Sequence, residues 1–173
     1  MTQIYSHMKK ILSFVILALA LSSCSEDLKF NNEAVFQGVK DNMPWKGGDA
    51  HATVVGSTLT IQASTLIETM ALKVPVPTTP IDPKNPATFV TYVLGTSNAR
   101  TASYSITDNG NDYEYETAIT VGDGEVVIKE YDGAFVSGTF RFNANNTDPD
   151  SVAPAVVNLQ SGVFYKVPIV PAP

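Results

Sequence analysis

Residues 134–143 read AFVSGTFRFN, and this stretch decides the fold. Small or apolar side chains occupy the even positions from Ala134 to Phe142, whereas the odd positions from Ser137 to Asn143 are polar. Successive side chains of a β-strand point to opposite faces, so the alternation predicts a strand with one buried face and one solvated face. Half-buried strands of this kind are typical of antiparallel sheets.

The same alternation recurs along the chain after residue 34. It is found in residues 58–63, 101–106 and 113–121, and in the last stretch the apolar face is predicted to hold Tyr113, Tyr115, Ile119 and Val121. No convincing helical period occurs there, although residues 64–72 would accommodate one helical turn. Pairs that favour hairpin turns separate the stretches. They are Gly56-Ser57, Asn109-Gly110, Asp123-Gly124, Asp132-Gly133 and Ser161-Gly162.

These patterns predict an all-β fold for residues 34–173, with a single antiparallel domain of nine or ten strands joined mainly as a meander. Such strands must cover their apolar faces, either as a β-sandwich or as a flattened meander barrel. The alternation does not choose between the two. Residues 75–86 hold five of the eleven prolines, which deny donors to a sheet, and they predict a loop.

The first 33 residues have a different character. Residues 8–10 (MKK) are a short basic start, and the apolar run of residues 11–21 (ILSFVILALAL) is too short to span a bilayer. Residues 21–24 (LSSC) resemble a bacterial lipobox, in which the cysteine is acylated after cleavage. The resemblance implies that residues 1–23 are a signal peptide with its true start at Met8, that Cys24 is lipidated, and that residues 24–33 tether the domain.

Residues 25–27 (SED) are similar to the acidic tract that directs lipoproteins of the Bacteroidota to the outer face of the outer membrane. The resemblance implies a lipid-anchored protein of the outer membrane that is exposed at the cell surface. Two or three acyl chains anchor stably because each buried methylene contributes about 0.8 kcal/mol. The membrane is therefore an expected partner through the N-terminal lipid.

The composition excludes several classes of function. Apolar residues make up 44% of the chain and charged residues 16%, as in a globular protein. Residues 24–173 carry nine Lys and Arg against 17 Asp and Glu, a net charge of −8, which disfavours nucleic-acid binding. Cys24 is the only cysteine, and His51 is the only histidine after residue 7. These counts argue against disulfides, Cys/His zinc sites and cysteine nucleophiles, and we expect no metal and no cofactor.

Four aromatic residues are candidates for ligand contact: Trp45, Tyr104, Tyr113 and Tyr115. The three tyrosines lie on apolar strand faces, where they fill the core of a sandwich or line the cavity of a barrel. Trp45 follows a proline beside a turn and is expected to cap one end of the core.

Candidates for catalysis are fewer. Glu114 and Glu116 share one strand face with their Cα atoms about 7 Å apart, a spacing at which two carboxylates can hydrolyse a glycosidic bond. Catalytic pairs need a cleft, whereas this face is expected to be solvated. Residues 108–112 (DNGND) offer oxygens for calcium but lack the EF-hand spacing, which favours a plain hairpin turn. His51 is expected to be structural because no Gly-x-Ser-x-Gly elbow is present.

A second resemblance rests on Phe36, residues 41–45 (DNMPW), residues 59–61 (LTI), residues 131–133 (YDG) and residues 136–142 (VSGTFRF). This pattern is similar to a family of small anchored Bacteroidota lipoproteins of unknown function, and it covers nearly all of the chain after Cys24. Asn42 stands where a glycine is more usual, and asparagine tolerates the left-handed turn.

We therefore expect a non-catalytic binding or structural module of the cell envelope. Its expected partner is a polysaccharide, another envelope protein or a small apolar ligand. The alternative is a surface glycan hydrolase that uses Glu114 and Glu116.

Overall fold

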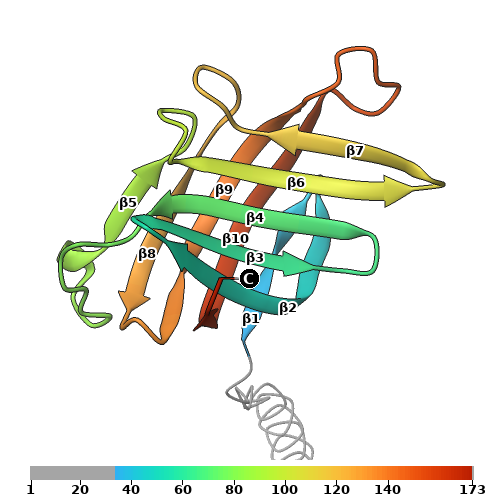
Figure 1. Ribbon diagram of the computed structural model, residues 1–173. Coiled ribbons are helices and arrows are strands. Elements are labelled where there is room, and N and C mark those ends of the chain that lie inside the picture. The colour runs from blue at the N-terminus through green and yellow to red at the C-terminus, as the bar shows by residue number, and fades with distance from the viewer. Residues whose placement is uncertain (1–33, 173) are drawn as a thin grey trace, which may run out of the picture. The chain divides into compact units, whose positions relative to one another are not determined.

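The computed structural model describes residues 34–172 (Figure 1), and the predicted signal peptide, Cys24 and tether lie outside these residues. The described residues form an all-β fold with one short 3-10 helix, η1. The elements are β1 (Val35–Lys40), β2 (Met43–Val55), β3 (Thr58–Ser64), β4 (Glu68–Pro75), η1 (Pro86–Thr88), β5 (Val90–Val93), β6 (Thr101–Asp108), β7 (Asn111–Glu116), β8 (Asp123–Tyr131), β9 (Phe135–Asn146) and β10 (Val156–Val170).

Hydrogen bonds close the sheet into a ring, as in a barrel. They run from β1 through β2, β3, β4, β6, β7, β9 and β10 and return to β1. One edge of strand β9 pairs with two strands in turn. Residues 136–143 of β9 pair with β8, and residues 145 and 146 pair with β7. Strand β5 pairs with β8 and extends the sheet beyond it. All pairings are antiparallel except a short parallel contact between β2 and β10. The prediction of an antiparallel all-β fold is confirmed. Of the two alternatives, a sandwich or a barrel, the structure has the closed sheet of a barrel.

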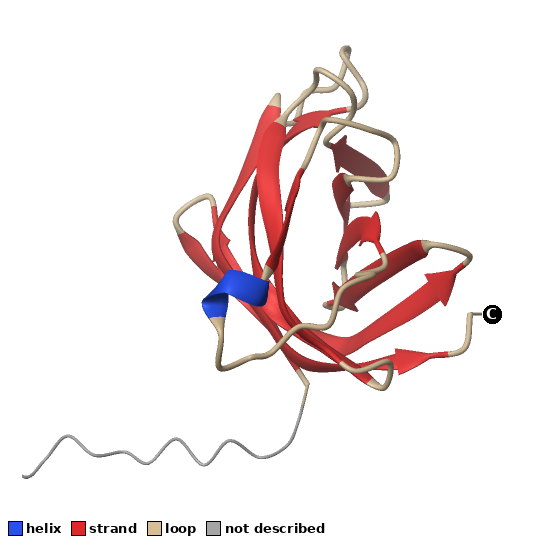
Figure 2. Cartoon of the chain, turned by 90° about the vertical axis from the view of Figure 1, so that its left-hand side faces the viewer, coloured by secondary structure: helices blue, strands red, loops and turns tan. Residues whose placement is uncertain are grey.

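The sheet wraps round because its long strands bend. In Figure 1 the strands β3, β4, β6 and β7 cross the front of the molecule, and β1, β8, β9 and β10 run steeply behind them. Irregular register marks the bends in β2 and β10, where Asp49, Ser161 and Lys166 have positive φ angles of 46°, 52° and 47°. Bulges of this kind increase the local twist and let a strand turn a corner. Figure 2, turned by 90°, shows the front and back strands of this closed sheet facing each other across the interior.

Three of the predicted hairpin turns are confirmed, at residues 56–57, 109–110 and 132–133. The turn between β1 and β2 places Asp41 and Asn42 at φ 47° and 68°, which is the conformation that asparagine tolerates.

Two predicted turns are wrong, because Asp123-Gly124 lies in β8 and Ser161-Gly162 lies in β10. The glycines there allow close packing within strands. A Cβ atom on Gly162 would come within 2.5 Å of the Phe140 ring, and one on Gly124 would come within 2.7 Å of the Phe142 Cβ atom. A glycine placed for close approach looks the same in the sequence as a glycine placed for a turn.

The predicted alternation of residues 113–121 is confirmed only as far as Glu116. Strand β7 ends at Glu116, and Ile119 and Val121 are 52% and 39% exposed in the turn that follows. Residues 64–72 hold no helical turn, since β3 ends at Ser64 and β4 begins at Glu68. The predicted proline-rich loop is confirmed between β4 and η1.

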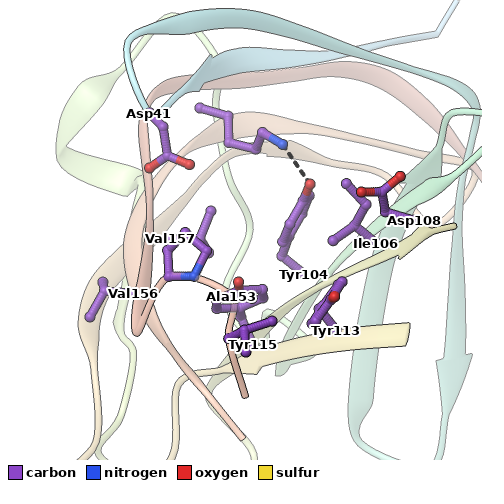
Figure 3. Close-up of a pocket in the computed structure, with 12 residues that line it drawn as sticks. Asp41, Tyr104, Ile106, Asp108, Tyr113, Tyr115, Ala153, Val156 and Val157 are labelled. Atoms are coloured by element: carbon purple, nitrogen blue, oxygen red, sulfur yellow. Dashed lines mark hydrogen bonds between the residues drawn. The ribbon is translucent and has the colours of Figure 1, made fainter. Parts of the chain in front are cut away.

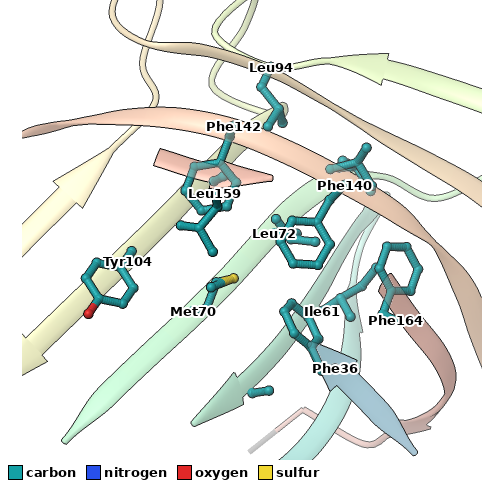
Figure 4. Close-up of a cluster of buried hydrophobic side chains, with 14 of the residues drawn as sticks. Phe36, Ile61, Met70, Leu72, Leu94, Tyr104, Phe140, Phe142, Leu159 and Phe164 are labelled. Carbon is teal, nitrogen blue, oxygen red and sulfur yellow. The ribbon is translucent and has the colours of Figure 1, made fainter. Parts of the chain in front are cut away.

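The core fills the inside of the ring (Figure 4) with side chains from every strand. Its tightest part is a group of three rings, Phe36, Phe140 and Phe164, which we call the phenylalanine cluster. The Phe36 and Phe140 centroids are 5.0 Å apart, and both rings also pack on Phe164. A Cβ atom on Gly138 would come within 2.5 Å of the Phe164 ring, so the missing side chain makes room for this packing.

Candidate functional site

A pocket of about 310 Å³ opens where the β1–β2 turn, the β6–β7 hairpin and the β9–β10 connection come together (Figure 3). Lys40 and Asp41 line it from the end of β1, and residues 152–154, 156 and 157 line it from the β9–β10 connection and the start of β10. Strands β6 and β7 contribute Tyr104, Tyr113 and Tyr115. We call this site the tyrosine pocket.

The three tyrosines share one wall because of the hairpin register. Tyr104 pairs with Tyr115, and Ile106 pairs with Tyr113, so all four side chains point to the inner face of the hairpin. The Tyr104 and Tyr115 rings are 5.8 Å apart and only 2% and 4% exposed, whereas Tyr113 is half-buried. The structure therefore brings together three of the four aromatic residues that the sequence singles out.

A polar network anchors the inner end of this wall. The Lys40 ammonium donates to Glu68 Oε1 at 2.5 Å and to Tyr104 Oη at 2.6 Å, and Tyr104 Oη donates to the same carboxylate oxygen at 2.5 Å. Glu68 is held at the start of β4, where its backbone N–H donates to Thr65 Oγ1 at 3.0 Å. Charge-assisted bonds of this kind are shorter and stronger than neutral ones.

The network fixes the ionisation of its members. Burial alone would raise the pKa of Glu68, but the hydrogen bonds from Lys40 and Tyr104 and the charge of Lys40 outweigh it, and the pKa lies below its usual value. Burial and the neighbouring Glu68 carboxylate raise the pKa of Tyr104. Glu68 is therefore an ionised acceptor, and the Tyr104 phenol keeps its proton and donates it.

Carboxylates stand at the rim of the pocket. Figure 3 shows Asp41 and Asp108 on opposite sides of Tyr104. Asp41 Oδ1 accepts the backbone N–H of Asn158 at 2.9 Å, which holds this side chain over the pocket. The field of Asp41 contributes, after burial, to the raised pKa of Tyr115. The rim thus presents negative charge above an aromatic and aliphatic floor.

Trp45 lies elsewhere in the interior. Its side chain is 5% exposed, packs edge-on against Phe36 at 5.9 Å and donates from Nε1 to Glu68 Oε2 at 2.8 Å. The residue borders a separate hollow with Pro44 and Ser161. Trp45 therefore packs in the core, as its place beside the turn predicts, and supports the tyrosine pocket only through Glu68.

Of the remaining candidates, only Asp108 of the DNGND stretch lines the pocket. Glu114 and Glu116 are exposed on the outer face of β7, as expected of a solvated strand face, and the DNGND stretch forms the β6–β7 hairpin turn. His51 contacts the Gln62 side chain at 2.9 Å and the Asp49 carbonyl at 2.9 Å on the surface of β2 and β3. Glu114 and Glu116 therefore do not face a common cleft, and His51 bonds to neighbouring residues of its own sheet.

Lys40 and Glu68 were missed by the sequence reasoning. They are 28 positions apart, and Tyr104 lies 36 positions beyond Glu68. No local spacing marks them, since they meet only because β1, β4 and β6 converge. In the sequence each is a charged residue at the end of a largely apolar stretch: Lys40 follows residues 35–39, and Glu68 precedes residues 69–72.

Within residues 34–172, no group of three or more His, Asp or Glu side chains is arranged to hold a metal ion. The same part of the chain contains no helix that is both long enough and apolar enough to cross a membrane.

Residues 32–168 match a protein family described as Domain of unknown function (DUF6252). The match covers most of the chain, so the protein belongs to this family. No curated protein and no solved structure matches the chain.

Proposed function

We propose that the protein is a lipid-anchored binding module of the outer membrane that works by contact and not by catalysis. The tyrosine pocket is its binding site. The observation that carries this proposal is an aromatic-walled hollow with two carboxylates at its rim, of which Asp41 is held by a hydrogen bond from the Asn158 backbone N–H. Small-molecule and peptide sites commonly combine an apolar wall with a few well-placed polar groups.

The path of the chain supports this arrangement. Residue 34 enters the domain at the start of β1, and Lys40 and Asp41 line the pocket at the other end of the same strand. By strand rise the two ends are about 17 Å apart. Lys40 and Asp41 thus line the pocket at the opposite end of β1 from the point at which residue 34 enters the domain.

The lipid anchor is tested by changing Cys24 to serine in the native host. The proposal expects the wild-type chain to sediment with outer membranes and Cys24→Ser to lose that association, since serine cannot form the thioether. Protease treatment of intact cells is expected to remove the domain. A Cys24→Ser protein that still sediments with membranes, or a domain that survives the protease, would contradict the anchor or its exposure respectively.

The binding role is tested with probes of the three expected partner classes. A soluble polysaccharide, an envelope-protein peptide and an apolar fluorophore are each titrated against the chain and against Ala153→Trp, which places an indole in the pocket. We expect one class to bind wild type and to lose affinity in the variant. Cleavage of the polysaccharide by wild type, with loss of cleavage in Glu114→Gln, would instead support a glycan hydrolase.

A further inference from the structure

We infer that the tyrosine pocket docks a basic segment of a partner protein, with an arginine or lysine side chain lying against the tyrosines and its charge beside Asp41 and Asp108. This inference rests on the proposed binding function and names its partner class.

The charges of the pocket favour a cationic occupant. Lys40 is the only basic residue in its lining, and the Glu68 carboxylate already pairs with that ammonium at 2.5 Å. Neither Asp41 nor Asp108 belongs to an ion pair among the described residues. Burying two such carboxylates against a neutral or anionic group costs free energy, whereas a cation offsets that cost.

The negative charge continues beyond the rim. A second hollow shares Tyr113 and Val152 with the pocket, so the two adjoin. The lining of this second hollow contains no Lys or Arg and carries four further carboxylates, which belong to Asp112, Glu114, Asp148 and Asp150. A partner with more than one basic side chain can therefore place charge in both hollows, and a single inorganic cation cannot.

The pocket wall already holds one cation. The Lys40 ammonium lies 2.6 Å from Tyr104 Oη and 4.7 Å from the centroid of the Tyr104 ring, so it sits at the hydroxyl edge and leaves the ring face uncovered by this charge. The half-buried Tyr113 lines the pocket, and its ring offers an apolar surface to the aliphatic stem of an incoming arginine or lysine. Val152 and Val156 are 95% and 45% exposed at the rim, which favours a peptide that covers apolar surface around its basic residue.

The experiment measures binding of a short acetylated peptide with two arginines to the full chain in detergent. A peptide of the same sequence with citrulline at both positions has nearly the same shape without charge. Asp41→Asn with Asp108→Asn removes the rim charges, and asparagine retains the oxygen that accepts the Asn158 N–H and tolerates the positive φ of Asp41. Asp49→Asn with Asp82→Asn removes two charges outside both hollows as the matched control.

We expect the arginine peptide to bind, with an affinity that falls at least about tenfold in the rim variant and less than about threefold in the control variant. The citrulline peptide should bind at least about tenfold more weakly than the arginine peptide, and added salt should weaken binding of the arginine peptide.

Two results would overturn the inference. Equal loss in the rim and control variants would mean that only the net charge attracts the peptide. Failure of the arginine peptide to bind the wild-type chain would refute the basic partner. Binding of a neutral polysaccharide or apolar probe that Ala153→Trp abolishes would in that case leave the binding function standing.

Discussion

The phenylalanine cluster and the tyrosine pocket are built by the same strand alternation, yet one is filled and the other is open. In the cluster, Gly138 and Gly162 bring the backbone against the rings of Phe164 and Phe140. In the pocket, the tyrosine wall ends in hydroxyl and charged groups that bond to one another and leave a hollow. The comparison suggests that the first region carries stability and the second is available for binding.

The largest expected effect is on the phenylalanine cluster. Phe140→Ala removes a ring that is 3% exposed and contacts two other rings of the cluster, so the free energy of unfolding should fall by about 4 kcal/mol. Tyr113→Ala, at the half-buried wall of the pocket, should cost about 1 kcal/mol. Urea denaturation measures both, and similar losses for the two variants would remove the distinction between the regions.

The next effect concerns the glycines. Gly138→Ala places a Cβ atom against the Val127 carbonyl and the Phe164 ring, and we expect a loss of about 3 kcal/mol from the free energy of unfolding. Gly48→Ala is the matched control, because its nearest neighbour would be the Ser64 carbonyl oxygen at 3.7 Å. Thermal or urea unfolding compares the two, and an equal response would show that Gly138 is not placed for packing.

A smaller effect is expected at the polar end of the pocket. Glu68→Gln leaves the Lys40 ammonium without its carboxylate, and since Glu68 is only 14% exposed we expect a loss of about 2 kcal/mol. The exposed pair of Arg141 and Glu125 supplies the control, in which Glu125→Gln should cost less than about 0.5 kcal/mol. Equal losses in urea unfolding would mean that the network is an ordinary surface ion pair.

The smallest effect is the pH dependence of this network. Because the pKa of Glu68 is lowered in the folded chain, its ionisation adds stability that is fully present above its unfolded value of 4.5 and is lost as the pH falls through the folded pKa. The difference in unfolding free energy between wild type and Glu68→Gln should therefore shrink below about pH 4.5. A difference that stays constant from pH 7 to pH 3 would contradict the assignment.

The sequence predicted which side chains of the alternating strands face inward. Period-two alternation identified Leu59, Ile61, Tyr104 and Tyr115 as inward-facing, and all four are buried. This works because the strand repeat fixes which face each side chain takes.

The sequence could not predict the closure of the sheet or the Lys40–Glu68 contact. Both depend on which strands become neighbours, and β1 meets β10 across more than 100 positions of the chain. For the same reason the sequence wrongly predicts turns at Gly124 and Gly162, since the Phe142 backbone and the Phe140 ring that they accommodate lie on another strand. Non-local pairing carries no local sequence signal.

We propose that the partner docks in the tyrosine pocket. Titrating isotope-labelled full chain with the two-arginine peptide, and following the backbone amide signals by NMR, locates the docking site residue by residue. We expect shifts concentrated at Lys40, Asp41, Tyr113 and Val156, with the amides of the phenylalanine cluster unmoved. Shifts centred on another face, such as the free edge of β5, or no shifts at all would contradict the proposal.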